Sequence, residues 1–173
     1  MANTYTLISS NVLASSAASV TFSAIPSTYT DLVLRISARS DNATTLDSII
    51  YTVNGLSTSI YSYVYLRGSG TAASSALASA SGSGLLAYGA DGATATASTF
   101  SNSELYVPNY TASQNKQLSW FGVQENNLAA ANIAVSGNLT QTTSAISSIT
   151  LSLNVGPNFV TGSSFYLYGI KSN

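Results

Sequence analysis

The stretch Asp31-Leu32-Val33-Leu34-Arg35-Ile36-Ser37-Ala38-Arg39-Ser40 decides the fold class of this protein. Even-numbered positions from 32 to 38 are apolar, whereas positions 35, 37 and 39 are polar. Because successive side chains of a strand point to opposite faces, the stretch predicts a strand with one buried face and one wet face. Alternation of this kind is typical of antiparallel sheets that are solvated on one side.

Similar runs, rich in β-branched and aromatic residues, recur along the whole chain. We expect strands at residues 5–13, 19–25, 31–40, 46–53, 58–67, 103–107, 117–125, 133–136, 148–155 and 164–171. Between strands 46–53 and 58–67 lies Asn54-Gly55, a pair that suits the two positive φ angles of a type I′ turn. The pair predicts a hairpin over residues 46–67.

Frequent strands without an amphipathic helix predict a single all-β domain over residues 1–173, built as an antiparallel two-sheet sandwich. The number of strands favours a jelly-roll-like arrangement, and an immunoglobulin-like one remains the alternative, although its cysteines are absent. Residues 1–15 are expected to form an N-terminal strand or arm.

Two stretches, 68–84 and 89–98, consist almost wholly of Gly, Ala, Ser and Thr and interrupt the alternation. We interpret them as loop regions, with thin and closely packed strands as the alternative, because small side chains permit both flexibility and close approach of backbones.

Charged residues make up only 6% of the chain, and the net charge is −1. Copies of such a protein repel one another weakly, which favours self-association or docking. The five cationic residues are scattered along the sequence, so neither nucleic acid nor an anionic membrane is an expected partner. No run of 18 apolar residues occurs, and residues 1–5 lack the features of a secretory signal.

Histidine and cysteine are both absent, which excludes Ser-His-Asp and Cys-His catalysis and thiolate zinc sites. A Ser-Lys pair has no recognisable motif around either lysine. Paired carboxylates could serve a glycosidase, but each acidic residue also fits a turn or a polar strand position; these residues are Asp31, Asp41, Asp47, Asp91, Glu104 and Glu125. We therefore expect no enzymatic activity, no cofactor and no metal site.

Tyr61, Tyr63, Tyr65 and Arg67 share one face of a predicted strand and form the candidate interface. Tyr and Arg are enriched at protein interfaces, and aromatic rings flanked by hydroxyls can stack on sugars. The structural alternative is a cross-strand ladder or the rim of the core. Trp120 and Phe121 are adjacent and must point to opposite faces, so at most one of them is in the core.

Two segments, Thr28-Tyr29-Thr30-Asp31-Leu32-Val33-Leu34-Arg35-Ile36-Ser37-Ala38-Arg39-Ser40 and Ser164-Phe165-Tyr166-Leu167-Tyr168-Gly169-Ile170-Lys171, resemble small structural proteins of tailed bacteriophages, especially those of aquatic and cyanobacterial hosts. The resemblance covers both ends of the chain and leaves the middle unmatched. It implies a role on the virion surface, either on the capsid shell or in a host-recognition fibre.

The leading expectation is a capsid decoration (cement) protein, a homotrimer that binds the major capsid protein on the outer surface of the phage head and stabilises the shell. The alternative is a tail-fibre or host-glycan-binding adhesin domain that uses the face of Tyr61, Tyr63 and Tyr65. A polysaccharide-degrading enzyme ranks last.

Overall fold

The computed structural model describes residues 4–127 and 131–171 of the chain, and twelve strands but no helix occur among them. In chain order the strands are β1 (Tyr5–Val12), β2 (Ser19–Phe22), β3 (Asp31–Ser37), β4 (Leu46–Val53), β5 (Tyr61–Ser69), β6 (Ala72–Ser81), β7 (Gly84–Asp91), β8 (Asn102–Val107), β9 (Lys116–Gln124), β10 (Asn132–Thr140), β11 (Ile149–Leu153) and β12 (Ser164–Ile170).

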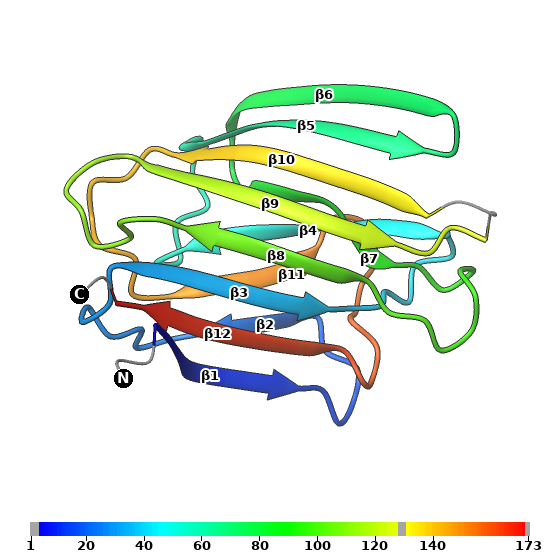
Figure 1. The fold of residues 1–173 in the computed structure, drawn as a ribbon, viewed down its shortest axis with the longest axis horizontal. Coiled ribbons are helices and arrows are strands. Elements are labelled where there is room, and N and C mark those ends of the chain that lie inside the picture. Colours follow the sequence, from blue (N-terminus) through cyan, green and yellow to red (C-terminus); the bar gives the residue numbers. More distant parts are fainter. Residues whose placement is uncertain (1–3, 128–130, 172–173) are drawn as a thin grey trace.

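Two antiparallel sheets form the two layers of the molecule (Figure 1). The larger has eight strands in the order β1-β12-β3-β8-β9-β10-β5-β6, and the smaller has four in the order β2-β11-β4-β7. The all-β, antiparallel two-sheet sandwich predicted from the alternation is therefore confirmed.

The strand order contains a jelly roll. Four strands of the large sheet, β1-β12-β3-β8, face the four strands β2-β11-β4-β7 of the small sheet. Following the chain, these eight strands alternate between the sheets in the manner of two Greek keys, except that β4 and β7 are consecutive and pair within the small sheet. The jelly-roll-like arrangement is thus confirmed over the alternative immunoglobulin-like one.

Two hairpins are inserted into this jelly roll. Strands β5 and β6 lie between β4 and β7 in the chain, and β9 and β10 lie between β8 and β11. Both hairpins join the large sheet beyond β8, so that the sheet continues past the edge of the small one (Figure 1). The side chains of Trp120 on β9 and Ser136 on β10 anchor this extension by donating hydrogen bonds to the carbonyl oxygens of Ala87 and Leu85 on β7.

The main core fills the space between the sheets. It includes the buried face of the stretch that decided the fold class, where Leu32, Leu34, Ile36 and Ala38 are at most 3% exposed. Hydrophobic burial of such side chains contributes roughly 1.5–3 kcal/mol each, which makes the core the main source of stability in a chain without disulfides.

The small-residue stretch 68–84 is mostly strand, contrary to the loop interpretation, because it contains the end of β5 and all of β6. In the stretch 89–98, β7 ends at Asp91 and a loop follows. This loop wraps around the Arg39 guanidinium, which donates hydrogen bonds to the carbonyl oxygens of Ala93, Ala95, Thr96 and Thr99. Arg39, predicted on the wet face, is consequently only 9% exposed.

The prediction that residues 46–67 pair as a hairpin is wrong, although the predicted turn forms. Asn54 and Gly55 have φ values of 53° and 69°, and the Leu56 N–H donates to the Val53 carbonyl at 2.9 Å. Beyond the turn the chain crosses between layers, so that β4 pairs with β7 and β11 while β5 pairs with β6 and β10. The turn chemistry specified the local bend but not the partner strand.

Candidate functional site

The four residues of the candidate interface share the face of β5 that packs toward the small sheet. Tyr61 is only 1% exposed. Its hydroxyl donates to the Leu56 carbonyl and accepts from the Val53 N–H, at 2.8 and 2.9 Å. Burial raises the pKa of Tyr61, and the Val53 N–H opposes this rise. Tyr61 therefore fixes the crossing between the two sheets and is not available to a partner.

Tyr63 and Tyr65 pack over the edge of the small sheet, in a small cluster built around Leu85, Ala87 and Ala134. The Tyr65 ring meets the Tyr88 ring edge-on, with 5.8 Å between the centroids. The Tyr88 hydroxyl, and after it burial, raises the pKa of Tyr65. These tyrosines hold the inserted hairpin against β7.

Arg67 ends the row of tyrosines and also turns inward. Its guanidinium stacks over the Tyr88 ring, and its Nε donates to Asn132 Oδ1 at 2.5 Å. With its charge held in this way, Arg67 belongs to the inner layer. The recognition role expected for this face of β5 stays a prediction, and Tyr63 also lines the groove described below.

The outer face of the same hairpins carries an exposed group of large apolar side chains, here named the apolar outer patch. Its members are Val64, Leu66, Leu77, Phe121, Ile133 and Val135, with exposed fractions of 51, 59, 74, 47, 44 and 38%. All six belong to the inserted strands β5, β6, β9 and β10. The strand register places Val64 opposite Leu77, and Val135 between Leu66 and Phe121, so the patch is contiguous. Contiguous exposed apolar area of this kind marks interaction surfaces.

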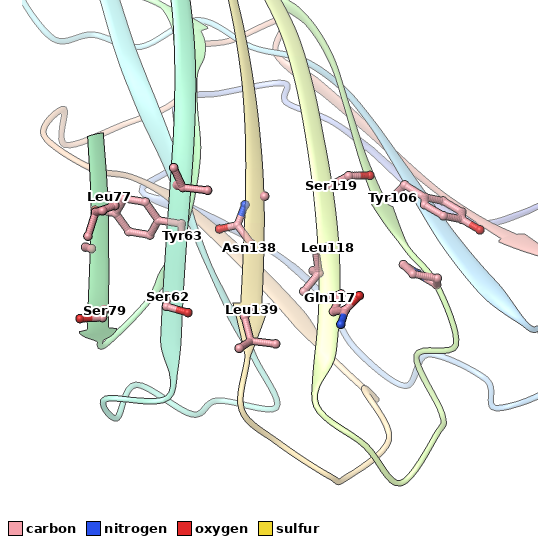
Figure 2. A pocket seen from close by; sticks show the side chains of 14 residues that line it. Ser62, Tyr63, Leu77, Ser79, Tyr106, Gln117, Leu118, Ser119, Asn138 and Leu139 are labelled. Atoms are coloured by element: carbon pink, nitrogen blue, oxygen red, sulfur yellow. The ribbon is translucent and has the colours of Figure 1, made fainter. Parts of the chain in front are cut away.

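An open groove of about 800 Å³ adjoins the patch (Figure 2). Leu77 and Val64 form one wall, and Tyr106 with Pro108 forms the other. The space above Gly137 in the floor is open, since a Cβ atom there would meet only Val64 Cγ1, at 4.0 Å.

Polar groups line the same floor, and no charged side chain contributes to the groove. Ser62, Gln117 and Ser119 are the main hydroxyl and amide groups, drawn in Figure 2 along the strands on either side of Leu139. A mostly apolar hollow with a few polar groups suits an uncharged ligand or a protein segment.

The Tyr106 wall is fixed in place by Asp31, the first residue of the stretch that decided the fold class. The Tyr106 hydroxyl donates to Asp31 Oδ2, and the Asn109 N–H donates to Asp31 Oδ1, each at 2.8 Å. The hydrogen bond to Asp31 is the main cause that raises the pKa of Tyr106. The groove is thus partly preorganised before any ligand arrives.

The carboxylates have structural partners. Glu104 pairs with Arg35 at 2.8 Å on the solvated face. Asp47 Oδ2 accepts hydrogen bonds from the Ser40 hydroxyl and the Gly156 N–H, which ties the start of β4 to the loops after β3 and β11. Within residues 4–127 and 131–171, no three acidic side chains gather as metal ligands would.

The sequence contains a signal for the apolar outer patch, but the tyrosines on the other face of β5 are the more conspicuous feature of the strand. From Tyr61 to Leu66, the tyrosines occupy one face of the strand, and Val64 and Leu66 lie on the other, so both faces carry apolar side chains. Period-two alternation identifies residues that share a face but cannot tell which face meets the second layer. Leu77 was missed because its strand, β6, otherwise contains only Ala and Ser.

No family model matches the chain, and no curated protein matches it either. Across the described part of the chain, no helix is long and apolar enough to cross a membrane.

Proposed function

We propose that this protein is a virion structural protein, a capsid decoration protein that docks on the outer surface of a phage head shell through the apolar outer patch. The patch is the observation that carries the proposal, because it is contiguous, exposed and confined to hairpins added to the jelly roll. Sites of this kind, added to a common scaffold, usually hold the function of a fold.

The charge distribution supports docking over electrostatic binding. The groove is lined by uncharged residues, and the Arg35–Glu104 pair neutralises its own charges next to Phe121, which lies opposite Glu104 in the register. Such a surface gains affinity from desolvation of apolar area and a few hydrogen bonds. We propose that it binds the major capsid protein and has no catalytic role.

The test is co-sedimentation with expanded, undecorated phage shells assembled from a major capsid protein. The native protein should sediment with the shells, and Leu66→Lys, which places a charge inside the patch, should lower the bound fraction at least tenfold. The matched control is Leu7→Lys on β1, since Leu7 is 51% exposed but lies away from the patch. Failure of the native protein to bind, or equal binding by both variants, would refute shell docking.

A host-glycan-binding role is the second candidate, and the groove is the observation that favours it. Tyr106 lies opposite Ser119 in the strand register, and Gln117 and Ser62 line the same groove, a combination of aromatic and hydroxyl or amide groups that can accommodate a sugar. Gly137→Trp should fill the groove, because the space above Gly137 is open. Loss of binding to host cells in Gly137→Trp, with normal binding in Leu66→Lys, would favour the glycan role over shell docking.

A further inference from the structure

Strand β6 is an unprotected edge of the large sheet. It is the longest strand, with ten residues, and eight of them are exposed. Because the small sheet does not extend beneath it, β6 is open to solvent on both faces as well as along its free edge (Figure 1). A free edge carries a row of backbone N–H and C=O groups that can pair with another strand.

The usual devices that block edge pairing are missing from β6. Five Ala, four Ser and Leu77 make up the strand, so it contains neither charge nor proline. Its irregularity lies near the end, between the pairs Tyr63–Ala78 and Tyr61–Ser81, and leaves Ala72–Ala78 in regular register. The opposite edge strand, β1, differs because it carries a bulge between Leu7 and Ser9, near its middle. Bulges discourage further pairing.

Pairing of β6 with a second copy of itself fits this composition. An antiparallel pair about a two-fold axis is self-complementary, so any charge near the axis would meet its own copy. No such charge exists in β6, and the net charge of −1 adds little repulsion between copies. Alanine side chains lose no conformational freedom on association, and serine loses little, so ordering this strand costs less than ordering most others.

The apolar outer patch restricts the register of such a pair. Outward-facing side chains remain on the outer face only if the two-fold axis crosses β6 at one residue. An axis at Leu77 places the two Leu77 side chains directly opposite, and an axis at Ala76 places them on a diagonal. Either register joins the two patches around Leu77, which is 74% exposed in the single chain.

We propose that two copies of this chain pair through β6, antiparallel, about a two-fold axis at Ala76 or Leu77. The result is one continuous sixteen-stranded sheet, twice the eight strands of one copy. This contact closes at two copies, so it gives a dimer in place of the trimer expected from the sequence. The inference is independent of shell docking.

Single cysteines test the axis directly, because the native chain has none. Under mild oxidation, Ala76→Cys or Leu77→Cys should yield a disulfide-linked dimer. Ser74→Cys and Ser79→Cys should not, because their two copies lie at least four residues apart along the pair, on the order of 13 Å, which exceeds the span of a disulfide. Thr6→Cys on β1 is the control for the other edge. Absence of linkage at both Ala76 and Leu77, or equal linkage at all five positions, would overturn the proposal.

Oppositely charged substitutions at Ala76 provide the second test. They leave the apolar outer patch unchanged, because Ala76 lies opposite Tyr65 on the inward-facing side of its strand. Sedimentation velocity should give twice the 17.8 kDa chain mass for the native protein. Ala76→Lys alone and Ala76→Glu alone should each be monomeric, and a mixture of the two should restore the dimer. Thr6→Lys should remain dimeric. A monomeric or trimeric native protein, or dissociation by Thr6→Lys alone, would refute pairing through β6. Because shell binding is measured separately with Leu66→Lys, the two proposals fail independently.

Discussion

The guanidinium of Arg67 lies over the ring of Tyr88, with 4.2 Å between Cζ and the ring centroid. Arg67 belongs to β5 of the large sheet and Tyr88 to β7 of the small one, so this cation–π contact holds the inserted hairpin against the jelly roll. It also explains why the outer face of β5 presents Val64 and Leu66, because the tyrosines and Arg67 of the strand are used between the layers.

Replacement of Arg67 should weaken the fold without affecting binding. Arg67→Met removes both the cation–π contact and the hydrogen bond to Asn132, and should lower the free energy of unfolding by about 1–2 kcal/mol in urea titration. Arg35→Met is the matched control, since Arg35 has a 56% exposed side chain and a single surface ion pair. That variant should stay within about 0.5 kcal/mol of the native protein. Lost shell binding in Arg67→Met would contradict the inward assignment.

Replacement of Gly84 by alanine and replacement of Gly137 by alanine should have different effects on the stability of the fold. A Cβ atom at Gly84 would lie 2.1 Å from a Tyr51 ring carbon, and Tyr51 is buried at the centre of the core. Gly84→Ala should therefore lower the free energy of unfolding by about 1–3 kcal/mol, the usual result of overpacking. Gly137→Ala meets open space and should leave stability unchanged or slightly raised. Thermal unfolding followed by circular dichroism would distinguish them, and equal behaviour would argue against the packing around Tyr51.

Lys116 holds the loop before β9 through its ammonium group. Its Nζ donates to the carbonyl oxygens of Ala112, Gln114 and Thr142, and its side chain is 2% exposed. Lys116→Met keeps the aliphatic stem but leaves three carbonyls without this donor, so the free energy of unfolding should fall by about 2 kcal/mol. Lys171→Met at an exposed position is the control. Unchanged stability of Lys116→Met in chemical denaturation would show that water replaces the ammonium at little cost.

Asp91 should give a pH-dependent contribution to stability. Burial raises the pKa of its carboxyl, and hydrogen bonds from Thr99 and the Glu125 N–H, together with the Arg39 charge, offset part of the rise. A group whose pKa is raised by folding stabilises the protein below its unfolded pKa, and that contribution is lost as the pH rises through the folded pKa. Above about pH 4, the native protein should thus lose stability relative to Asp91→Asn.

The contribution of Glu125 to stability should depend on pH in the opposite direction to that of Asp91. The hydrogen bond from the Thr96 N–H is the main cause that lowers the pKa of this carboxyl, so its contribution is present above the unfolded pKa and disappears as the pH falls through the folded value. Urea unfolding at several pH values between 3 and 7 should show opposite trends for Asp91→Asn and Glu125→Gln, each relative to the native protein. Parallel trends would contradict the assignment for Asp91.

The sequence predicted the sandwich because most strands have one buried face, and alternation reports that arrangement directly. Alternation did not predict β6 and β7, in which the two faces are similarly exposed or similarly buried. In β7, Leu85, Leu86 and Ala87 are all buried, because this strand lies between β4 and the overhanging hairpins. In β6, by contrast, nearly every position is exposed, so no alternation arises. Both strands consequently lacked the alternation of buried and exposed positions that most of the other strands show.

Alternation placed Tyr61, Tyr63 and Tyr65 together on one face of β5 but could not tell which layer that face meets. Tyr61, Tyr63 and Tyr65 are large enough to read as a binding surface, yet their size is also what fills the gap where the large sheet passes the edge of the small one. Only the second layer distinguishes these alternatives, and its position depends on the crossing after Asn54-Gly55, which local turn chemistry does not specify.

The place of β12 between β1 and β3 has a consequence for how the chain matures. Tyr5 and Asp31 both pair with Ile170, so two early strands await the partner that is synthesised last among the twelve strands. The hairpins β5–β6 and β9–β10 join neighbours in the sequence and can form early, whereas the β1-β12-β3 end of the sheet forms only after β12 has been synthesised. Premature termination before Ser164 would leave two unpaired strand edges, and such a product is expected to aggregate.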